Sequence, residues 1–126
     1  MTNITRLFDF AYYQLDTFDL DRAFATKVNG AWEFTSSKDY ISQSNNISKS
    51  LLNKGVNKND KIAVISSTNR TEWNLVDIGV LQLGAQTIPI YPTISAEDYE
   101  YVINHSESIY CFVSDIEVYE KVKRIQ

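Results

Sequence analysis

One stretch near the middle of the chain limits the available folds more than any other. Residues 61–93 begin with Lys61–Ile65, an apolar, β-branched run of the kind found in buried strands. Four polar residues, a helical segment and a second β-branched run, Gln86–Tyr91, follow. Strand, helix and strand within about thirty residues predict a βαβ unit, in which a right-handed crossover joins two parallel strands.

The helix between these strands is apolar over most of its circumference. On a helical wheel, Asn74, Asp77 and Gln82 form a narrow polar stripe. The other positions carry large apolar side chains: Trp73, Leu75, Val76, Ile78, Val80, Leu81 and Leu83. A helix of this kind cannot lie on the outside of a small domain. We therefore expect a sheet on one side of it and further protein on the other.

The residues before this unit predict three more elements. Apolar residues spaced three and four apart indicate an amphipathic helix over Thr5–Thr17. Asn29–Gly30 between two strand-like runs is the strongest short-range signal for a β-hairpin. A capping hydroxyl within Thr35–Ser37 starts a second helix, for which Gly55 is a suitable residue just past the end. In the turn that follows, Asn59 suits a left-handed backbone conformation.

The residues after the βαβ unit continue the alternation. Ser95 and Asp98 have the spacing of a helix cap, which predicts a short helix to about His105. Ser108–Val113 is a third candidate for a buried strand, and Asp115 opens a last amphipathic helix. The predicted fold is α/β: a helix, a β-hairpin and a second helix precede part of a doubly wound parallel sheet with the order β-α-β-α-β-α.

Composition excludes several classes of function. The chain has 126 residues, enough for one domain, and its net charge of -4 argues against non-specific nucleic-acid binding. One cysteine rules out an internal disulfide, and no Cys/His spacing resembles a metal site. The N-terminus lacks the layout of a signal peptide, and no apolar run reaches the ~20 residues of a membrane span. We therefore expect a cytoplasmic protein.

The polar loop Ser66–Asn69 is the first candidate for chemistry, because it joins a parallel strand to a helix. Backbone amides at such a helix start bind anions readily. Phosphate-binding loops of this kind, however, depend on glycines, and there is none between Gly55 and Gly79. Asn69 with Glu72 three residues later is more simply explained as a capping pair than as part of a ligand site.

The remaining candidates have plain structural explanations. His105, the one histidine, is expected to be a surface or capping residue, and Cys111 an inert buried thiol. Trp73 is expected in the core, with a place on a cavity wall as the alternative. The acids Asp16, Asp19 and Asp21 lack the alternation of a calcium loop. The sequence thus predicts no catalytic, cofactor-binding or metal-binding residue in this chain.

A set of residues spaced along the central stretch carries a family resemblance: Asp60, Ile62, Ala63, Ser66, Asn69, Glu72, Trp73, Asp77, Leu81, Gly84, Ala85, Pro89, Tyr91 and Thr93. In these residues the chain resembles the adenylate-forming (AMP-binding) enzyme superfamily, and most nearly its long-chain fatty acid–CoA ligases. The hairpin segment Lys27–Trp32 and the turn Tyr91–Thr93 also look more like the fatty-acyl branch than like aryl-acid ligases.

The resemblance implies that residues 1–126 are the N-terminal portion, a single incomplete domain, of the large N-terminal domain of such an enzyme. The phosphate loop, the adenine and ribose sites and the catalytic lysine of the family would all follow Gln126. The full-length enzyme would convert a fatty acid and ATP to an acyl-adenylate and then to acyl-CoA, with Mg²⁺ and coenzyme A. The fragment itself is expected to be inactive and to bind none of these. Its partner would be the remainder of its own polypeptide.

Several alternatives stay open at this stage. The parent could be another acyl- or aryl-CoA ligase or an adenylation domain of the same superfamily. The chain could instead be a non-catalytic α/β interaction or dimerisation module, and a homodimer and peripheral membrane contact of the full-length form are left open. A receiver-type signalling domain is disfavoured because Ile65 is followed by Ser66 and Tyr91 by Pro92, where that class carries acids.

Overall fold

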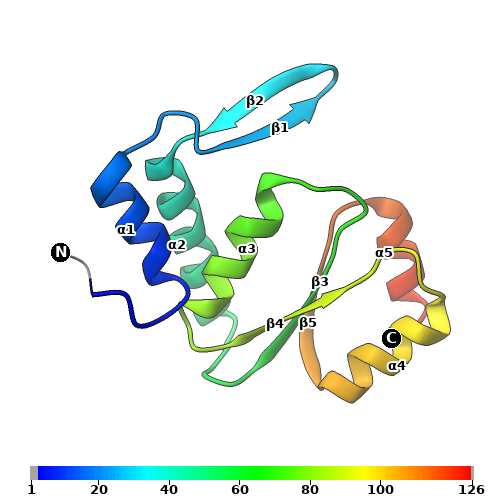
Figure 1. Ribbon diagram of the computed structural model, residues 1–126. Coiled ribbons are helices and arrows are strands. Elements are labelled where there is room, and N and C mark those ends of the chain that lie inside the picture. The colour runs from blue at the N-terminus through cyan, green and yellow to red at the C-terminus, as the bar shows by residue number, and fades with distance from the viewer. Residues whose placement is uncertain (1–2, 126) are drawn as a thin grey trace.

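The computed structural model describes residues 3–125 and has the predicted order of elements (Figure 1). The elements are α1 (Asp9–Phe18), β1 (Phe24–Val28), β2 (Ala31–Thr35), α2 (Ser37–Asn53), β3 (Lys61–Ile65), α3 (Thr71–Leu81), β4 (Gln86–Ile90), α4 (Ala96–Ser106), β5 (Ser108–Val113) and α5 (Ile116–Lys123). β1 and β2 form an antiparallel hairpin, and the other three strands form a parallel sheet. The predicted α/β class is confirmed.

Strand β3 is the centre of the parallel sheet, whose order is β4-β3-β5. Residues Ile62–Ile65 are all buried, because β3 has a neighbouring strand on each side and helices on both faces. Side chains of a strand alternate between the two faces. Ile62 and Val64 accordingly pack in one apolar cluster with α2 and α3, while Ala63 and Ile65 pack in another with α4 and α5.

The helices divide between the two faces of the sheet, as the doubly wound prediction requires (Figure 1). The β3–α3–β4 crossover places α3 on one face, and the β4–α4–β5 crossover returns across β3 with α4 on the other. Two right-handed crossovers that run in opposite directions must lie on opposite faces. α2 covers α3, and α1 packs against α2.

Helix α3 lies between two layers, which confirms the expectation from its apolar circumference. Val76 and Val80 pack toward the sheet, whereas Leu75 and Ile78 pack in a cluster with α1 and α2. The contact with α2 is so close that a Cβ on Gly79 would lie 2.7 Å from the Ile47 Cγ2 atom. A glycine is therefore required where these two helices meet.

The β-hairpin turns at the predicted Asn29–Gly30 pair, where both residues have positive φ. It is held to the body by its inner face. The Thr26 hydroxyl lies 2.7 Å from that of Thr71 and accepts a hydrogen bond from the Thr71 amide, and the Phe24 ring packs 4.6 Å from that of Tyr40, measured between centroids.

The predictions for the start of α1 and for the burial of β5 need correction. α1 begins at Asp9 and not at Thr5, because the buried Asp9 carboxylate accepts hydrogen bonds from the Thr5 and Arg6 amides and holds residues 5–8 in a turn. β5 is not a buried strand: Ile109 is 51% exposed. β5 forms an edge of the sheet, so an apolar sequence there does not imply burial on both sides.

Candidate functional site

The carboxyl ends of the three parallel strands form the candidate site. The loop after β3 leads to α3 on one face, whereas the loops after β4 and β5 lead to α4 and α5 on the other. Neighbouring loops that diverge in this way open a crevice at the strand ends, which is where open α/β sheets usually bind ligands. This geometry singles out residues 66–70, 91–95 and 114–115.

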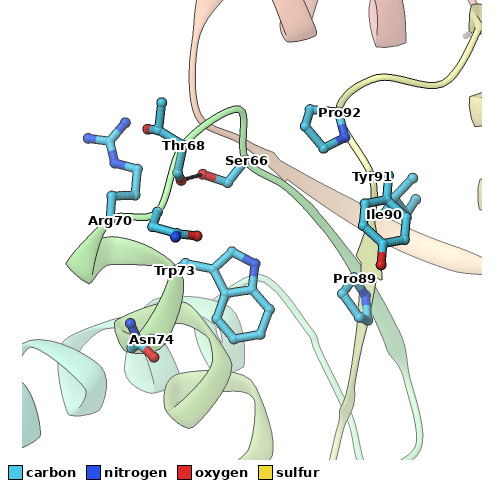
Figure 2. Close-up of a pocket in the computed structure, with 10 residues that line it drawn as sticks. Ser66, Thr68, Arg70, Trp73, Asn74, Pro89, Ile90, Tyr91 and Pro92 are labelled. Atoms are coloured by element: carbon cyan, nitrogen blue, oxygen red, sulfur yellow. Dashed lines mark hydrogen bonds between the residues drawn. The ribbon is translucent and has the colours of Figure 1, made fainter.

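An open cleft of about 630 Å³ lies between the β3–α3 loop and the end of β4. Figure 2 shows the Trp73 indole at its centre, with Ser66 and Thr68 of the loop on one side and Pro89, together with Tyr91, on the other. Trp73 is half-buried and also packs against the apolar cluster beneath it. It therefore fulfils both expectations, since one part of the side chain belongs to the core and another to the wall of the cleft.

Arg70 connects the β3–α3 loop to the end of β5. Its guanidinium donates two hydrogen bonds to the Glu72 carboxylate, of 3.0 and 2.7 Å, and one of 3.1 Å to the Ser114 carbonyl oxygen. The hydrogen-bonded pair raises the pKa of Arg70 and lowers the pKa of Glu72. Beneath Arg70 lies a second cleft of about 240 Å³ between the ends of β3 and β5.

A small hydrogen-bond network joins the loops after β3 and β5. The Ser67 hydroxyl donates to the Asp115 carboxylate (2.6 Å), the Ser114 hydroxyl donates to the same oxygen (2.7 Å), and the Ser67 amide donates to Ser114 Oγ (2.9 Å). These two hydroxyls and the Val118 amide lower the pKa of Asp115 to about 2. Asp115 is also the predicted cap of α5, which the Val118 hydrogen bond confirms.

The predicted capping pair Asn69–Glu72 is wrong. The N-cap of α3 is Arg70, which has no side-chain capping bond, and Asn69 is exposed. The Thr71 amide is instead satisfied by Thr26 of the hairpin, and Glu72 pairs with Arg70. A partner 45 residues away in the sequence leaves no local signal, so the pattern around residue 69 could not have revealed it.

Sequence reasoning also missed the network of Ser67, Ser114 and Asp115. Each of these residues follows a candidate strand, which was a usable signal, but their meeting depends on β3 and β5 being neighbours in the sheet. That strand order places β4, the strand that follows β3 in the sequence, on the opposite side of β3.

The other sequence candidates lie outside the cleft beside Trp73. His105 is exposed in the last turn of α4, where its ring stacks on Tyr101 at 5.5 Å between centroids. Cys111 is half-buried on β5, and burial raises the pKa of its thiol to about 11, so the thiol stays protonated near neutral pH. His105 is thus a surface residue, as expected, whereas Cys111 is only half-buried where a buried thiol was expected.

Residues 3–125 contain no group of three or more His, Cys, Asp or Glu side chains placed to hold a metal ion. None of the helices in this part of the chain combines the length and the apolar character needed to cross a membrane.

Comparisons with known proteins give a consistent result. The sequence model of the family described as AMP-binding enzyme matches residues 16–126. The chain is 33% identical over 85 residues to long-chain-fatty-acid–CoA ligase FadD15 of Mycobacterium bovis, covering 68% of this chain and 14% of that protein. It is 37% identical over 78 residues to fatty acyl-CoA synthetase A of Dictyostelium discoideum, covering 62% of this chain and 12% of the relative.

Among solved structures, the anthranilate CoA ligase AuaEII in complex with anthranoyl-AMP superimposes with a TM-score of 0.82 at 16% identity, covering 96% of this chain and 22% of that one. At this identity the likeness concerns the fold alone. With coverages of 14% and 12% of the two relatives, this chain spans a small part of their length. With the family model matching nearly all of the chain, residues 1–126 belong to the AMP-binding enzyme family.

Proposed function

We propose that residues 1–126 form the N-terminal portion of the large N-terminal domain of an ATP-dependent, AMP-forming long-chain fatty acid–CoA ligase. The whole enzyme would activate a fatty acid with ATP and Mg²⁺ to an acyl-adenylate, release pyrophosphate and transfer the acyl group to coenzyme A. The observation that carries the proposal is the identity of 33% and 37% to two proteins named for fatty acyl-CoA formation.

In this proposal the present residues support the active site and do not turn over substrate by themselves. In a loop of this kind, a phosphate would bind at the start of the helix, which here is the start of α3. The Thr71 amide is already paired with Thr26, and the Ser67 amide with Ser114. The Asp115 carboxylate borders the same loop and would repel a phosphate, and the one cation at the start of the helix, Arg70, is already paired with Glu72.

The test is an activity assay on two proteins: the longest natural polypeptide that contains this sequence, and residues 1–126 alone. With ATP, Mg²⁺, coenzyme A and a long-chain fatty acid, the longer protein is expected to release pyrophosphate and form a thioester, whereas residues 1–126 release none. Aryl acids and short-chain acids, assayed in parallel, test the substrate class.

Different failures have different meanings. A longer protein that activates aryl acids and not fatty acids would overturn the proposed substrate while leaving the adenylate-forming reaction intact. Pyrophosphate release by residues 1–126, or micromolar ATP binding to them in calorimetry, would overturn the proposal that they only support the site.

A further inference from the structure

A buried tyrosine of α4 holds the turn that follows β4. Tyr99 is completely buried in the apolar cluster formed by the sheet, α4 and α5. Its hydroxyl donates a hydrogen bond of 2.8 Å to the carbonyl oxygen of Pro92, which lies two residues beyond the end of β4. Because Tyr99 lies inside the fold, this contact does not depend on what covers the outer side of the turn in a longer polypeptide.

The backbone of this turn, residues 91–94, has little else to fix it. β4 pairs with β3 as far as Ile90, and the capping box of α4 begins at Ser95. In the described part of the chain, residues 91–94 make a single hydrogen bond, the one from Tyr99 to Pro92. The half-buried side chain of Ile94 also packs against the cluster. The Tyr99 hydroxyl is therefore the polar contact that sets the place of the turn.

Pro92 separates two hollows at the carboxyl ends of the strands. One is the cleft beside Trp73, and Figure 2 shows Pro92 at its edge, across from Ser66. The other hollow, of about 690 Å³, lies between the same turn and the start of α5, where Asp115 and Lys121 line it. A shift of the turn would therefore widen one hollow and narrow the other.

We propose that Tyr99 is a positioning residue for the reaction of the whole enzyme, and that its hydroxyl fixes the 91–94 turn beside a bound substrate. This role presupposes the proposed ligase function. Open α/β sheets bind ligands outside the carboxyl ends of their strands, which is where the turn lies. Tyr99 itself is buried and acts through Pro92. Such a turn must be placed accurately, because a misplacement of about 1 Å can cost about 100-fold in activity.

The hydroxyl distinguishes this role from ordinary packing. A phenylalanine ring would fill the same space in the cluster, and a hydroxyl is tolerated in an apolar environment only when it is hydrogen-bonded. The hydroxyl of Tyr99 thus adds nothing to the apolar packing and serves to hold the Pro92 carbonyl. Without this donor, the carbonyl would turn toward water, since a buried backbone group without a partner is unfavourable.

The test is a kinetic comparison of Tyr99→Phe with the unchanged protein, using the longest natural polypeptide that contains residues 1–126. KM is measured in turn for ATP, a long-chain fatty acid and coenzyme A. A loss of folded protein lowers the apparent kcat and leaves KM unchanged, whereas a displaced turn raises the KM of the substrate that it borders. We expect kcat/KM for one substrate to fall about tenfold through KM, with the other two KM values within about twofold.

Crystal structures of the same two proteins test the position of the turn directly. In Tyr99→Phe the Pro92 carbonyl should turn toward solvent while the ring at position 99 stays in place. Tyr110→Phe is the matched control, because it removes a tyrosine hydroxyl that donates to the Lys54 carbonyl, away from the two hollows beside Pro92. Val102→Ala removes packing from the Tyr99 cluster and keeps the hydroxyl. Both controls should keep the KM values of the unchanged protein.

Three results would overturn the proposal: a 91–94 turn that stays in place in Tyr99→Phe, KM values that do not change, or an equal rise in KM in Val102→Ala. The outcome also separates this role from the proposed function. An unchanged protein that neither releases pyrophosphate nor forms a thioester would refute the ligase function, and the role of Tyr99 with it. A fully active Tyr99→Phe enzyme would refute the role of Tyr99 alone.

Discussion

Helices α3 and α4 have the same length, eleven residues, and follow neighbouring strands, but different forces hold them. Six residues of α3 are buried, whereas in α4 only Tyr99 is. α4 begins with a complete capping box, in which Ser95 Oγ accepts from the Asp98 amide and the Asp98 carboxylate accepts from the Ser95 amide. α3 has no side-chain cap of its own and takes one from the hairpin.

The difference separates two ways of specifying a helix. The ends of α4 are encoded within its own sequence, with acids in its first turn and a histidine in its last. α3 depends on partners brought by the rest of the fold: the sheet, α2 and Thr26. Substitutions at the contacts of α3 should therefore reduce the stability of the whole fold.

The largest expected effect follows removal of a buried α3 side chain. Leu75 is 5% exposed and packs in the cluster shared with α1 and α2. Leu75→Ala should lower the free energy of unfolding by about 2–5 kcal/mol, because it leaves a cavity between two layers. Leu52→Ala, at a position 56% exposed on α2, is the matched control and should change it by about 0.5 kcal/mol or less. Urea denaturation measures both, and similar losses would contradict the two-layer packing of α3.

Gly79→Ala is expected to change the free energy of unfolding by a smaller amount, and the sign of that change is informative. At a helix position without close neighbours, replacing Gly by Ala stabilises the helix by about 1 kcal/mol. Here the new Cβ would lie 2.7 Å from Ile47 Cγ2 and 3.1 Å from the Ser44 carbonyl oxygen. We expect Gly79→Ala to cost about 1–3 kcal/mol, as overpacking usually does. Ser42→Ala, on the exposed side of α2, controls for helix propensity, and stabilisation by Gly79→Ala would show that α2 and α3 are not in close contact.

The third effect concerns the start of α3. Thr26→Val keeps the shape of the side chain but leaves the Thr71 amide without its acceptor, so we expect a loss of about 1–2 kcal/mol. Asn69→Ala should change stability by less than about 0.5 kcal/mol, because Asn69 is exposed and caps nothing. Ser95→Ala, the corresponding change at α4, should cost about 1 kcal/mol. If Asn69→Ala proved costlier than Thr26→Val, the local capping interpretation of α3 would be correct after all.

The same distinction explains how much of the fold could be predicted from the sequence. The sequence predicted the features that depend on neighbouring residues: the Asn29–Gly30 turn, the positive φ of Asn59, and the caps at Ser95 and Asp115. It did not predict the features that depend on distant residues. The cap of α3 comes from the hairpin, and the exposure of β5 depends on its place at the edge of the sheet.

The candidate site follows the same rule. The loop after β3 could be picked out because it joins a strand to a helix, and its lack of glycine argued against a phosphate cradle. Its actual partners, Ser114 and Asp115, lie 47 and 48 residues from Ser67 and meet it only through the order of strands in the sheet. Local patterns contain no information about that order.

Asp115 combines a local contact with a distant one. Its carboxylate accepts a hydrogen bond from the nearby Val118 amide and another from the hydroxyl of Ser67, which is distant in the sequence. Its pKa in the folded chain is about 2, below the ordinary value of 3.8. The stabilisation that it gives is therefore complete above about pH 4 and is lost as the pH falls toward 2. Because the group is accessible to solvent, we expect this to be the smallest of the four effects. Asp115→Asn should remove this part of the acid sensitivity and leave the part due to Asp9, whose pKa is lowered chiefly by its hydrogen bond with Arg6.

A carboxyl NMR titration can separate the effect of the distant donor, Ser67, on the Asp115 pKa from that of the local donors, Ser114 and Val118. Ser67→Ala removes one hydroxyl donor, so the pKa of Asp115 should rise part of the way toward its ordinary value, while the Ser114 and Val118 bonds keep it depressed. Ser66→Ala is the control, because the Ser66 hydroxyl donates to the Thr68 carbonyl and not to Asp115. A pKa that stays the same in Ser67→Ala would mean that the cap of α5 is wholly local, like that of α4. The contact between the loops after β3 and β5 would then contribute nothing to the charge state of the site.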